Sequence, residues 1–357
     1  MRALKNVLVT GGAGFIGSNF IQYLFGHSRF DGRVVNVDAL TYAGNPDNLS
    51  TVQARFDGSR YFFVRGDICG RLHIESIFRT YEIDTVVHFA AESHVDRSIL
   101  SPEAFVRTNV LGTFVMLDVA RCSWKGRDDV LFHHVSTDEV YGSLGDSGRF
   151  LETTPYDPRS PYSASKASSD HLTRAYNYTY GLPITLSNCS NNYGPYQFPE
   201  KFIPLMILNM LEGKPLPVYG DGKNIRDWLY VGDHNAAVWL IMQKSKSGEC
   251  YNIGGENECE NICVLNKLIE IVAAKTRKKV TELRSLICYM SDRPGHDRRY
   301  AINCDKIKNR LGWRQSVSFD EGLQATVDWY LANPAWIARV RSGEYLKWID
   351  ANYGARS

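Results

Sequence analysis

Short apolar runs alternate with helical patterns through the first half of the chain. Runs rich in Val, Leu, Ile and Phe occupy residues 6–10, 33–37, 61–64, 85–89 and 130–135. They are almost continuously apolar, which is typical of strands buried on both faces of a parallel sheet. Helical patterns lie between them, for example at 16–25 and 102–122. This repetition predicts an α/β fold built on a Rossmann-type, doubly wound parallel sheet.

The pattern changes near residue 190. Prolines and glycines become more frequent, and helices are predicted at 201–212, 233–244, 261–275 and 319–331. We therefore expect a dinucleotide-binding Rossmann domain over residues 1–190 and a smaller C-terminal α/β substrate domain over 191–357. Segment 233–250 is expected to pack back onto the first domain.

Composition and charge narrow the class of protein. The 357 residues are 44% hydrophobic, which allows a sizeable core, and 41 basic against 39 acidic residues leave a net charge of +2. Such a balance predicts no nucleic-acid or membrane partner. No apolar run is long enough to span a bilayer, and the N-terminus has no signal-peptide pattern. The eight cysteines show no CxxC pair, so we expect reduced thiols in a cytoplasmic protein, and no metal, since Cys259 and Cys263 have no matching second pair.

A glycine-rich turn follows the first predicted strand and precedes the first predicted helix. Gly11, Gly14 and Gly17 allow a tight turn, close approach of a pyrophosphate and close helix packing. Asp38 ends the second strand, about twenty residues further on, where a carboxylate can accept the ribose hydroxyls of a dinucleotide. A 2′-phosphate would meet its like charge, so NAD is favoured over NADP. Asp67 and Ile68 end the third strand, where adenine would lie, although Asp67 could instead be a helix cap.

Two further segments carry reactive side chains. Tyr162 and Lys166 lie one helical turn apart, so both project from one face. The lysine cation and a nicotinamide cation would favour the phenolate, which can take a proton from a sugar hydroxyl while the carbon gives hydride to NAD. Asp138 and Glu139 follow the strand at 130–135. Paired acids there suit elimination of water beside a ketone, because this reaction needs both a base and an acid.

Segments 38–45, 90–98, 137–142, 162–166 and 191–197 together resemble the dTDP-glucose 4,6-dehydratases of the extended short-chain dehydrogenase/reductase family. The resemblance covers roughly residues 5 to 330. It implies that Glu139 removes the C5 proton of the sugar, that Asp138 protonates the C6 leaving group and that Thr137 hydrogen-bonds the C4 oxygen. Hydride then returns to C6, so the cofactor is recycled. The substrate it implies is dTDP-glucose.

The same resemblance extends the candidate sites beyond these residues. For the cofactor it adds Phe15, Ile16, Thr41, Gly44, Ala90, Ala91 and Ser93 to the glycines, Asp38, Asp67, Ile68, Tyr162 and Lys166. For the sugar nucleotide it implies Ser93, Thr137, Asn192, Lys201, Pro217, Tyr219, Arg226, Asn261, Arg293 and His296. Cations and amide donors among these suit a diphosphate, and residues 217–219 would lie along the base.

Other functions stay open at this point. A dehydratase for UDP-glucose or another nucleotide sugar fits the same motifs, and an epimerase fits all of them except the Asp138–Glu139 pair. A catalytically inactive NAD-binding regulator would be expected to have lost Tyr162, Lys166 or one of the acids, and all are present. The resemblance also implies a homodimer, formed through the helices at 102–122 and 162–180.

Overall fold

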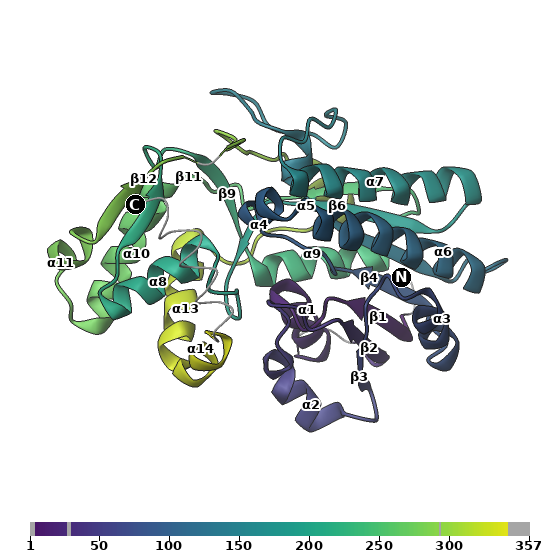
Figure 1. Ribbon diagram of the computed structural model, residues 1–357. Helices are drawn as coiled ribbons and strands as arrows, with labels where there is room; N and C mark the ends of the chain where they lie inside the picture. The colour runs from purple at the N-terminus through teal and green to yellow at the C-terminus, as the bar shows by residue number, and fades with distance from the viewer. Residues whose placement is uncertain (1–3, 27–29, 293, 342–357) are drawn as a thin grey trace.

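Parallel strands form the centre of the larger lobe (Figure 1). The computed structural model describes residues 4–26, 30–292 and 294–341. Within them, seven parallel strands form one sheet in the order β10-β6-β5-β4-β1-β2-β3. Their bounds are β1 Asn6–Thr10, β2 Arg33–Asp38, β3 Tyr61–Arg65, β4 Thr85–His88, β5 Leu131–Thr137, β6 Ile184–Cys189 and β10 Cys250–Ile253. The order reverses between β1 and β4, so a crevice opens at their carboxyl ends. The doubly wound fold is confirmed.

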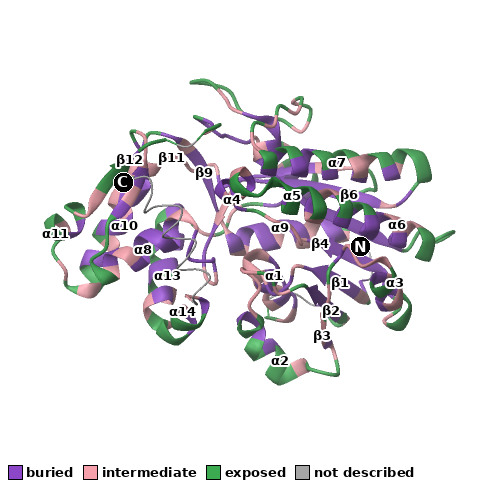
Figure 2. Ribbon diagram, viewed as in Figure 1, coloured by how far each residue is buried: buried purple, intermediate pink, exposed green. Residues whose placement is uncertain are grey.

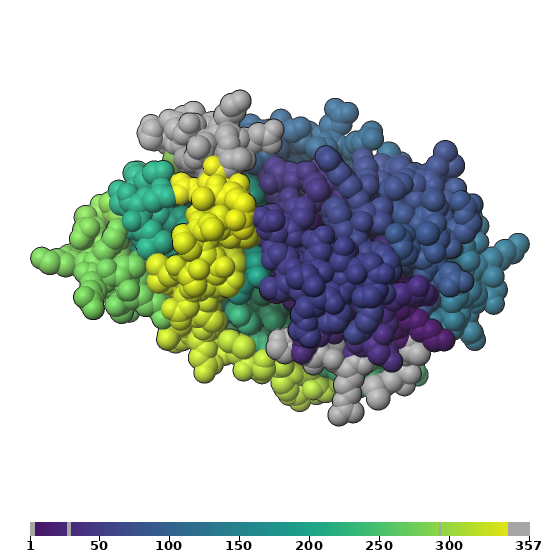
Figure 3. All heavy atoms as spheres, turned by 90° about the horizontal axis from the view of Figure 1, so that it is seen from below, coloured from purple at the N-terminus to yellow at the C-terminus, as the bar shows by residue number. Residues whose placement is uncertain are grey.

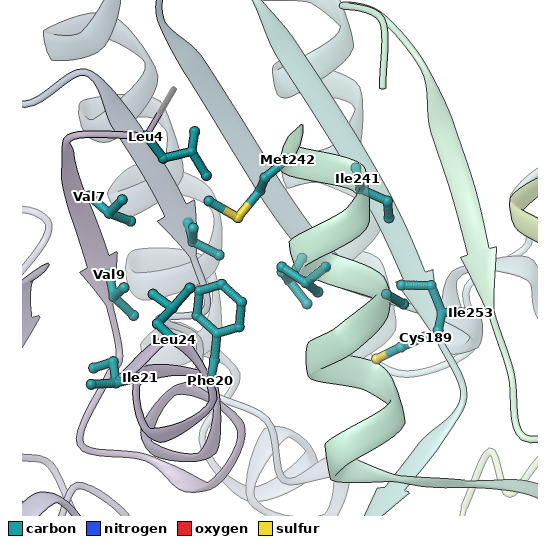
Figure 4. Packing of buried hydrophobic residues seen from close by; sticks show 14 of the residues in the cluster. Leu4, Val7, Val9, Phe20, Ile21, Leu24, Cys189, Ile241, Met242 and Ile253 are labelled. Atoms are coloured by element: carbon teal, nitrogen blue, oxygen red, sulfur yellow. The ribbon is translucent and has the colours of Figure 1, made fainter. Parts of the chain in front are cut away.

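Helices cover both faces of this sheet. Neighbouring residues Val7 and Leu8 belong to different hydrophobic clusters, because successive side chains of a strand point to opposite faces. One face packs against α1 (Phe15–Gly26) and α9 (Val231–Lys244), as Figure 4 shows for Phe20, Leu24 and Met242. The other packs against α3 (Arg71–Thr80), α6 (Thr113–Ser123) and α7 (Pro161–Tyr180). In Figure 2 the strands at the centre of the large sheet are buried, whereas the outer sides of α6 and α7 are exposed.

The helix predicted at 102–122 is not a regular α-helix throughout. It consists of α5 (Pro102–Phe105), the π-helical η2 (Val106–Gly112) and then α6. In the π-helical stretch the Asn109 side chain accepts from the Glu92 N–H at 2.9 Å and donates to its carbonyl at 3.0 Å. It also donates to Ser165 Oγ at 2.8 Å, so it fixes the segment after β4 against α7. Irregular helical turns of this kind often occur beside functional sites.

The smaller lobe has its own hydrophobic core. Four of its helices are α8 (Phe202–Glu212), α10 (Asn261–Thr276), α13 (Phe319–Ala332) and α14 (Pro334–Val340), with the short α11 (Val280–Arg284) at its edge. Strands β8 (Leu216–Tyr219) and β12 (Ile287–Met290) pair in parallel, and β11 (Glu258–Glu260), β9 (Ile225–Tyr230) and β7 (Asn191–Tyr193) form a second small sheet. None of the helices in the described part of the chain is long and apolar enough to cross a membrane.

The chain crosses between the lobes several times after residue 190. Helix α9 and strand β10 belong to the larger lobe, and so does the region of α12 (Asp305–Leu311) with Trp313. Near the end of the described chain, α14 lies against η1 (Pro46–Leu49), as the spheres of Figure 3 show. Trp336 Nε1 donates to Asn48 Oδ1 at 2.7 Å there. A single domain boundary at residue 190 stays a prediction. The remaining short helices of the larger lobe are α2 (Ser50–Phe56), α4 (Val95–Leu100) and η3 (Asp138–Tyr141).

Candidate active site

One cavity of about 350 Å³ lies at the carboxyl ends of the central strands, where the strand order reverses. Side chains from β5, α7, the glycine-rich turn and the start of the smaller lobe form its wall. The predicted residues on that wall are Gly11, Gly14, Phe15, Ile16, Gly17, Asp38, Thr41, Gly44, Asp67, Ile68, Ala90, Ala91, Ser93, Thr137, Asp138, Glu139, Tyr162, Lys166, Asn192 and Lys201. The structure therefore brings all the predicted catalytic residues and all the predicted cofactor residues into one cavity.

Close packing explains the glycines of the turn. Gly11 has a φ of +69°, and a Cβ on it would lie 2.8 Å from Ala90 Cα. A Cβ on Gly17 would lie 2.4 Å from the Gly11 carbonyl oxygen. Gly14 is less confined within the protein, since a Cβ there would meet only that oxygen, at 3.3 Å. Its place on the cavity wall at the start of α1 suits the close approach of an anion to free helix N–H groups.

Asp38 is held rigidly at the end of β2. Its Oδ2 accepts from the Ala13 N–H at 2.9 Å and its Oδ1 from the Leu40 N–H at 2.8 Å. Burial raises the pKa of Asp38, and the two backbone hydrogen bonds partly offset this. Each carboxylate oxygen keeps a second lone pair, so the group can still accept ribose hydroxyls.

Asp67 has a local structural role as well as its place on the cavity wall. Its Oδ1 accepts from the Cys69 N–H at 2.8 Å, which forms a turn before α3. The N-cap of α3 is Gly70, so Asp67 does not cap that helix in the usual sense. Its carboxylate is about half exposed, at 52%, and therefore open to a ligand.

Helix α7 positions Tyr162 and Lys166. Ser160 caps the helix through the Ser163 N–H, and Pro161 occupies its first turn. Lys166 is buried, at 5% exposure, and its Nζ donates to the Val135 carbonyl at 2.8 Å. Burial lowers the pKa of Lys166, and the charge of Asp170 raises it.

The Tyr162 phenol is protonated in this environment. Burial and then the charge of Glu139 raise its pKa well above the usual value, while a hydrogen bond with Thr137 lowers it. Lys166 is therefore not sufficient to create the expected phenolate. A further positive charge, such as that of an oxidised nicotinamide, would favour it.

The two acids lie in different environments although they are adjacent. Thr137 begins η3 by accepting from the Glu139 N–H at 3.3 Å. Asp138 is buried at 1% exposure, and its Oδ2 has no hydrogen-bond partner among the described residues. Burial, then the charges of Glu139 and Asp227, raise the pKa of Asp138 well above its usual value. This arrangement favours the protonated form of Asp138, as a general acid requires, beside a partly exposed Glu139 that lines the same cavity.

Sequence reasoning missed several residues of the cavity wall. Cys189 donates to the Ser136 carbonyl at 3.3 Å and accepts from Asn192 Nδ2 at the same distance. Glu200, at 3% exposure, pairs with Arg97, whose guanidinium lies 3.7 Å from the centre of the Tyr42 ring. Glu200 adjoins the predicted Lys201, whose Nζ donates to the Ser93 carbonyl at 2.8 Å. Its position next to Lys201 was the only feature of the sequence that could have indicated Glu200. Nothing in the sequence indicated Cys189, because the strand that it ends was not predicted.

The remaining sugar-nucleotide candidates do not line this cavity. They are Pro217, Tyr219, Arg226, Asn261 and His296, while Arg293 lies outside the described residues. Tyr219 donates to Asp96 Oδ2 at 3.1 Å, and its ring centre lies 6.1 Å from that of His296. Arg226 is buried, with its guanidinium 4.3 Å from the centre of the Tyr300 ring and a hydrogen bond to the Asp297 carbonyl. In the described part of the chain, no group of three or more His, Cys, Asp or Glu side chains is arranged to hold a metal ion.

Comparison with known proteins places this geometry in a family. A family model described as GDP-mannose 4,6 dehydratase matches residues 8–326. The dTDP-glucose 4,6-dehydratase of Salmonella typhimurium is 51% identical over 98% of this chain and 99% of its own length. Solved structures of dTDP-glucose 4,6-dehydratases are also similar. The Bacillus anthracis protein in complex with NAD has a TM-score of 0.83 and 46% identity, covering 94% of this chain and 99% of that one. DesIV from Streptomyces venezuelae has a TM-score of 0.86 and 45% identity, with the same coverage.

An epimerase is a more distant neighbour. The UDP-glucose 4-epimerase of Thermotoga maritima has a TM-score of 0.81 but only 30% identity, over 92% of this chain and 99% of its own. Fold alone does not separate the two activities. The chain belongs to the nucleotide-sugar-modifying branch of the extended short-chain dehydrogenase/reductases, and within it to the dTDP-glucose 4,6-dehydratase family.

Proposed function

We propose that this chain is an NAD-dependent hydro-lyase that converts dTDP-glucose to dTDP-4-keto-6-deoxyglucose in deoxysugar biosynthesis. One observation supports this above all: the same cavity is lined by the glycine-rich turn, by Asp38 and by the reactive side chains of Tyr162, Lys166, Asp138 and Glu139. A dinucleotide site, a proton-accepting phenol and an acid–base carboxyl pair are the groups that this reaction needs. The Salmonella typhimurium and Bacillus anthracis relatives are named dTDP-glucose 4,6-dehydratases, which supports the same reaction for this chain.

The residues divide the chemistry among them. Gly11, Gly14, Gly17 and Asp38 would hold NAD, which would supply the acceptor for the C4 hydride and the source of the hydride for C6. Tyr162 takes the proton of the C4 hydroxyl, while Thr137 holds the C4 oxygen and Lys166 stabilises the phenolate. The resulting ketone acidifies C5–H, so Glu139 can remove that proton. Burial favours the protonated form of Asp138, which gives its proton to the C6 hydroxyl so that it leaves as water. When hydride adds to C6 of the resulting alkene, Glu139 returns its proton to C5, which completes the 4-keto-6-deoxy product.

The sugar nucleotide is proposed to extend from this cavity towards the smaller lobe. Asn192 and Lys201 lie on the cavity wall, at the side of that lobe. Arg226 and Asn261 would hold the diphosphate from β9 and the start of α10. Pro217 and Tyr219, both on β8, would lie along the base with His296 nearby.

Product analysis with four nucleotide sugars tests both the reaction and the base. With NAD supplied, we expect dTDP-glucose to give a 4-keto-6-deoxy product, seen by its near-ultraviolet absorbance in alkali. UDP-, CDP- and GDP-glucose are the comparison substrates, and we expect slower turnover for each. Faster turnover of UDP-glucose would contradict the proposed base preference, whereas a C4 epimer without any keto product would contradict the dehydratase itself.

We also propose that the protein is a cytoplasmic homodimer. Apolar side chains on η2 and α6 are exposed: Val106 at 57%, Leu111 at 44% and Phe114 at 37%. Tyr180 at the end of α7 is also exposed, at 56%. A second copy covering these helices would remove this apolar surface from water. In sedimentation, we expect a particle of twice the monomer mass, and a particle of monomer mass would exclude the dimer. The eight free thiols support the cytoplasmic location.

A further inference from the structure

The helix that carries Tyr162 and Lys166 also carries a buried carboxylate that the proposed mechanism does not use. Asp170 is on α7, one helical turn after Lys166, and its side chain is fully buried. An unpaired charge at such a position would be strongly destabilising, so the partners of Asp170 show what it does there.

Asp170 joins α7 to β5 at two points. Its Oδ1 pairs with His134 Nε2 at 3.0 Å, and its Oδ2 accepts from Ser136 Oγ at 2.8 Å. His134 and Ser136 are two apart on β5, so their side chains leave the same face of the strand. Between them stands Val135, whose carbonyl accepts the hydrogen bond of Lys166 Nζ. The Asp170 carboxylate and the Lys166 ammonium therefore form hydrogen bonds with the same three-residue stretch of β5.

This stretch leads straight into the catalytic acids. Strand β5 ends at Thr137 and is followed by Asp138 and Glu139, whereas α7 carries Tyr162 and Lys166. Asp170 thus fixes the register between the two elements whose side chains must meet around one sugar. A displacement of either element would separate the phenol from Thr137, with which it forms a hydrogen bond.

Asp170 also acts on Lys166 through its negative charge, one helical turn away, while the Lys166 ammonium itself donates to the Val135 carbonyl. Burial would raise the pKa of Asp170, but hydrogen bonds from His134 and Ser136 and the charge of Lys166 outweigh it, so the pKa is lowered. Burial and then the charge of Lys166 lower the pKa of His134, although Asp170 opposes this, so the neutral imidazole is favoured. Its Nε2 carries the proton and donates to the carboxylate. The titratable or charged groups around the pair are His88 on β4, His134 on β5, Cys189 on β6, Cys250 on β10, Tyr141 on η3, Tyr156 before α7 and Arg174 on α7 itself.

We propose that Asp170 is a positioning residue for the proposed reaction, which keeps Lys166 positively charged and holds α7 in register with β5. The inference rests on the proposed function, since it assigns a support to the Tyr162–Lys166 pair. Asp170 touches neither substrate nor cofactor, because it is buried behind Lys166 and is not on the cavity wall.

The substitution Asp170→Asn tests the charge with little change of shape. Loss of the negative charge lowers the pKa of Lys166, so its ammonium is lost at lower pH. We expect the alkaline limb of the kcat/KM profile for dTDP-glucose to move down by about one pH unit. The control is Tyr156→Phe, which removes a 2.9 Å hydrogen bond to Asp170 Oδ2 but keeps the charge, and its alkaline limb should coincide with that of the wild type.

Each outcome has one interpretation. An Asp170→Asn enzyme whose alkaline limb coincides with that of the wild type would overturn the inference, even if its melting temperature had fallen. If Asp170→Asn does not fold, Asp170→Glu keeps the charge and displaces it by one methylene. Then the alkaline limb should stay in place while kcat falls, and a shifted limb with unchanged kcat would count against the proposal. A wild-type protein without dehydratase activity would instead contradict the proposed function.

Discussion

Replacing Tyr162 by phenylalanine is expected to lower kcat for dTDP-glucose by about 10³-fold, within the range for loss of a general base. The hydroxyl that would accept the C4 proton disappears, so C4 cannot release hydride and neither later step begins. Hydride transfer is followed through the near-ultraviolet absorbance of NADH after mixing enzyme, NAD and substrate. We expect no detectable NADH in a single turnover.

The packing around Tyr162 makes this substitution informative. Its ring lies in a small buried cluster with Val95 and Phe105, and the Phe105 ring centre is 6.2 Å away. A phenylalanine keeps these contacts and loses the hydrogen bond with Thr137, so the melting temperature and the affinity for NAD should change little. Turnover near the wild-type rate would show that another group accepts the C4 proton. The protein would then have to be searched for a different base.

The predicted part of the sheet follows from simple physics. Strands β1, β2, β4 and β5 are buried on both faces between layers of helices, and long apolar runs are typical of such positions. Strand β6 escaped prediction because its sequence includes Ser187 and Asn188, polar residues that rarely indicate a central strand. Each is fully buried with a tertiary partner: Ser187 contacts His133 Nε2 at 3.2 Å, and Asn188 donates to the Thr137 carbonyl. Those partners are distant in sequence, so no local pattern reveals them.

The same distinction applies to the site. Residues that follow a strand of the parallel sheet were predictable as a group, because carboxyl ends of parallel strands share one edge. The smaller lobe has no such rule, since the chain leaves and re-enters it after residue 190. The position of Arg226 beside Tyr300 depends on that path, and so does the separation of Tyr219 from the cavity. The raised pKa of Tyr162 could not be predicted from the sequence either, because it results from burial, which opposes the lowering expected from Lys166.

Replacing Glu139 by glutamine should separate oxidation from elimination. The charge of Glu139 raises the pKa of Tyr162, so its removal makes loss of the phenol proton easier and does not hinder oxidation at C4. Removal of the C5 proton then lacks its base, and elimination should slow by about 10²- to 10⁴-fold. We expect bound NADH to accumulate, and deuterium from solvent no longer to enter at C5.

The matched variant Asp138→Asn removes the neighbouring carboxyl instead, so it should still exchange C5–H while water is not expelled. Elimination or C5 exchange at the wild-type rate in Glu139→Gln would refute its role as the base, and would leave the two adjacent acids without the separate functions that their different burial favours.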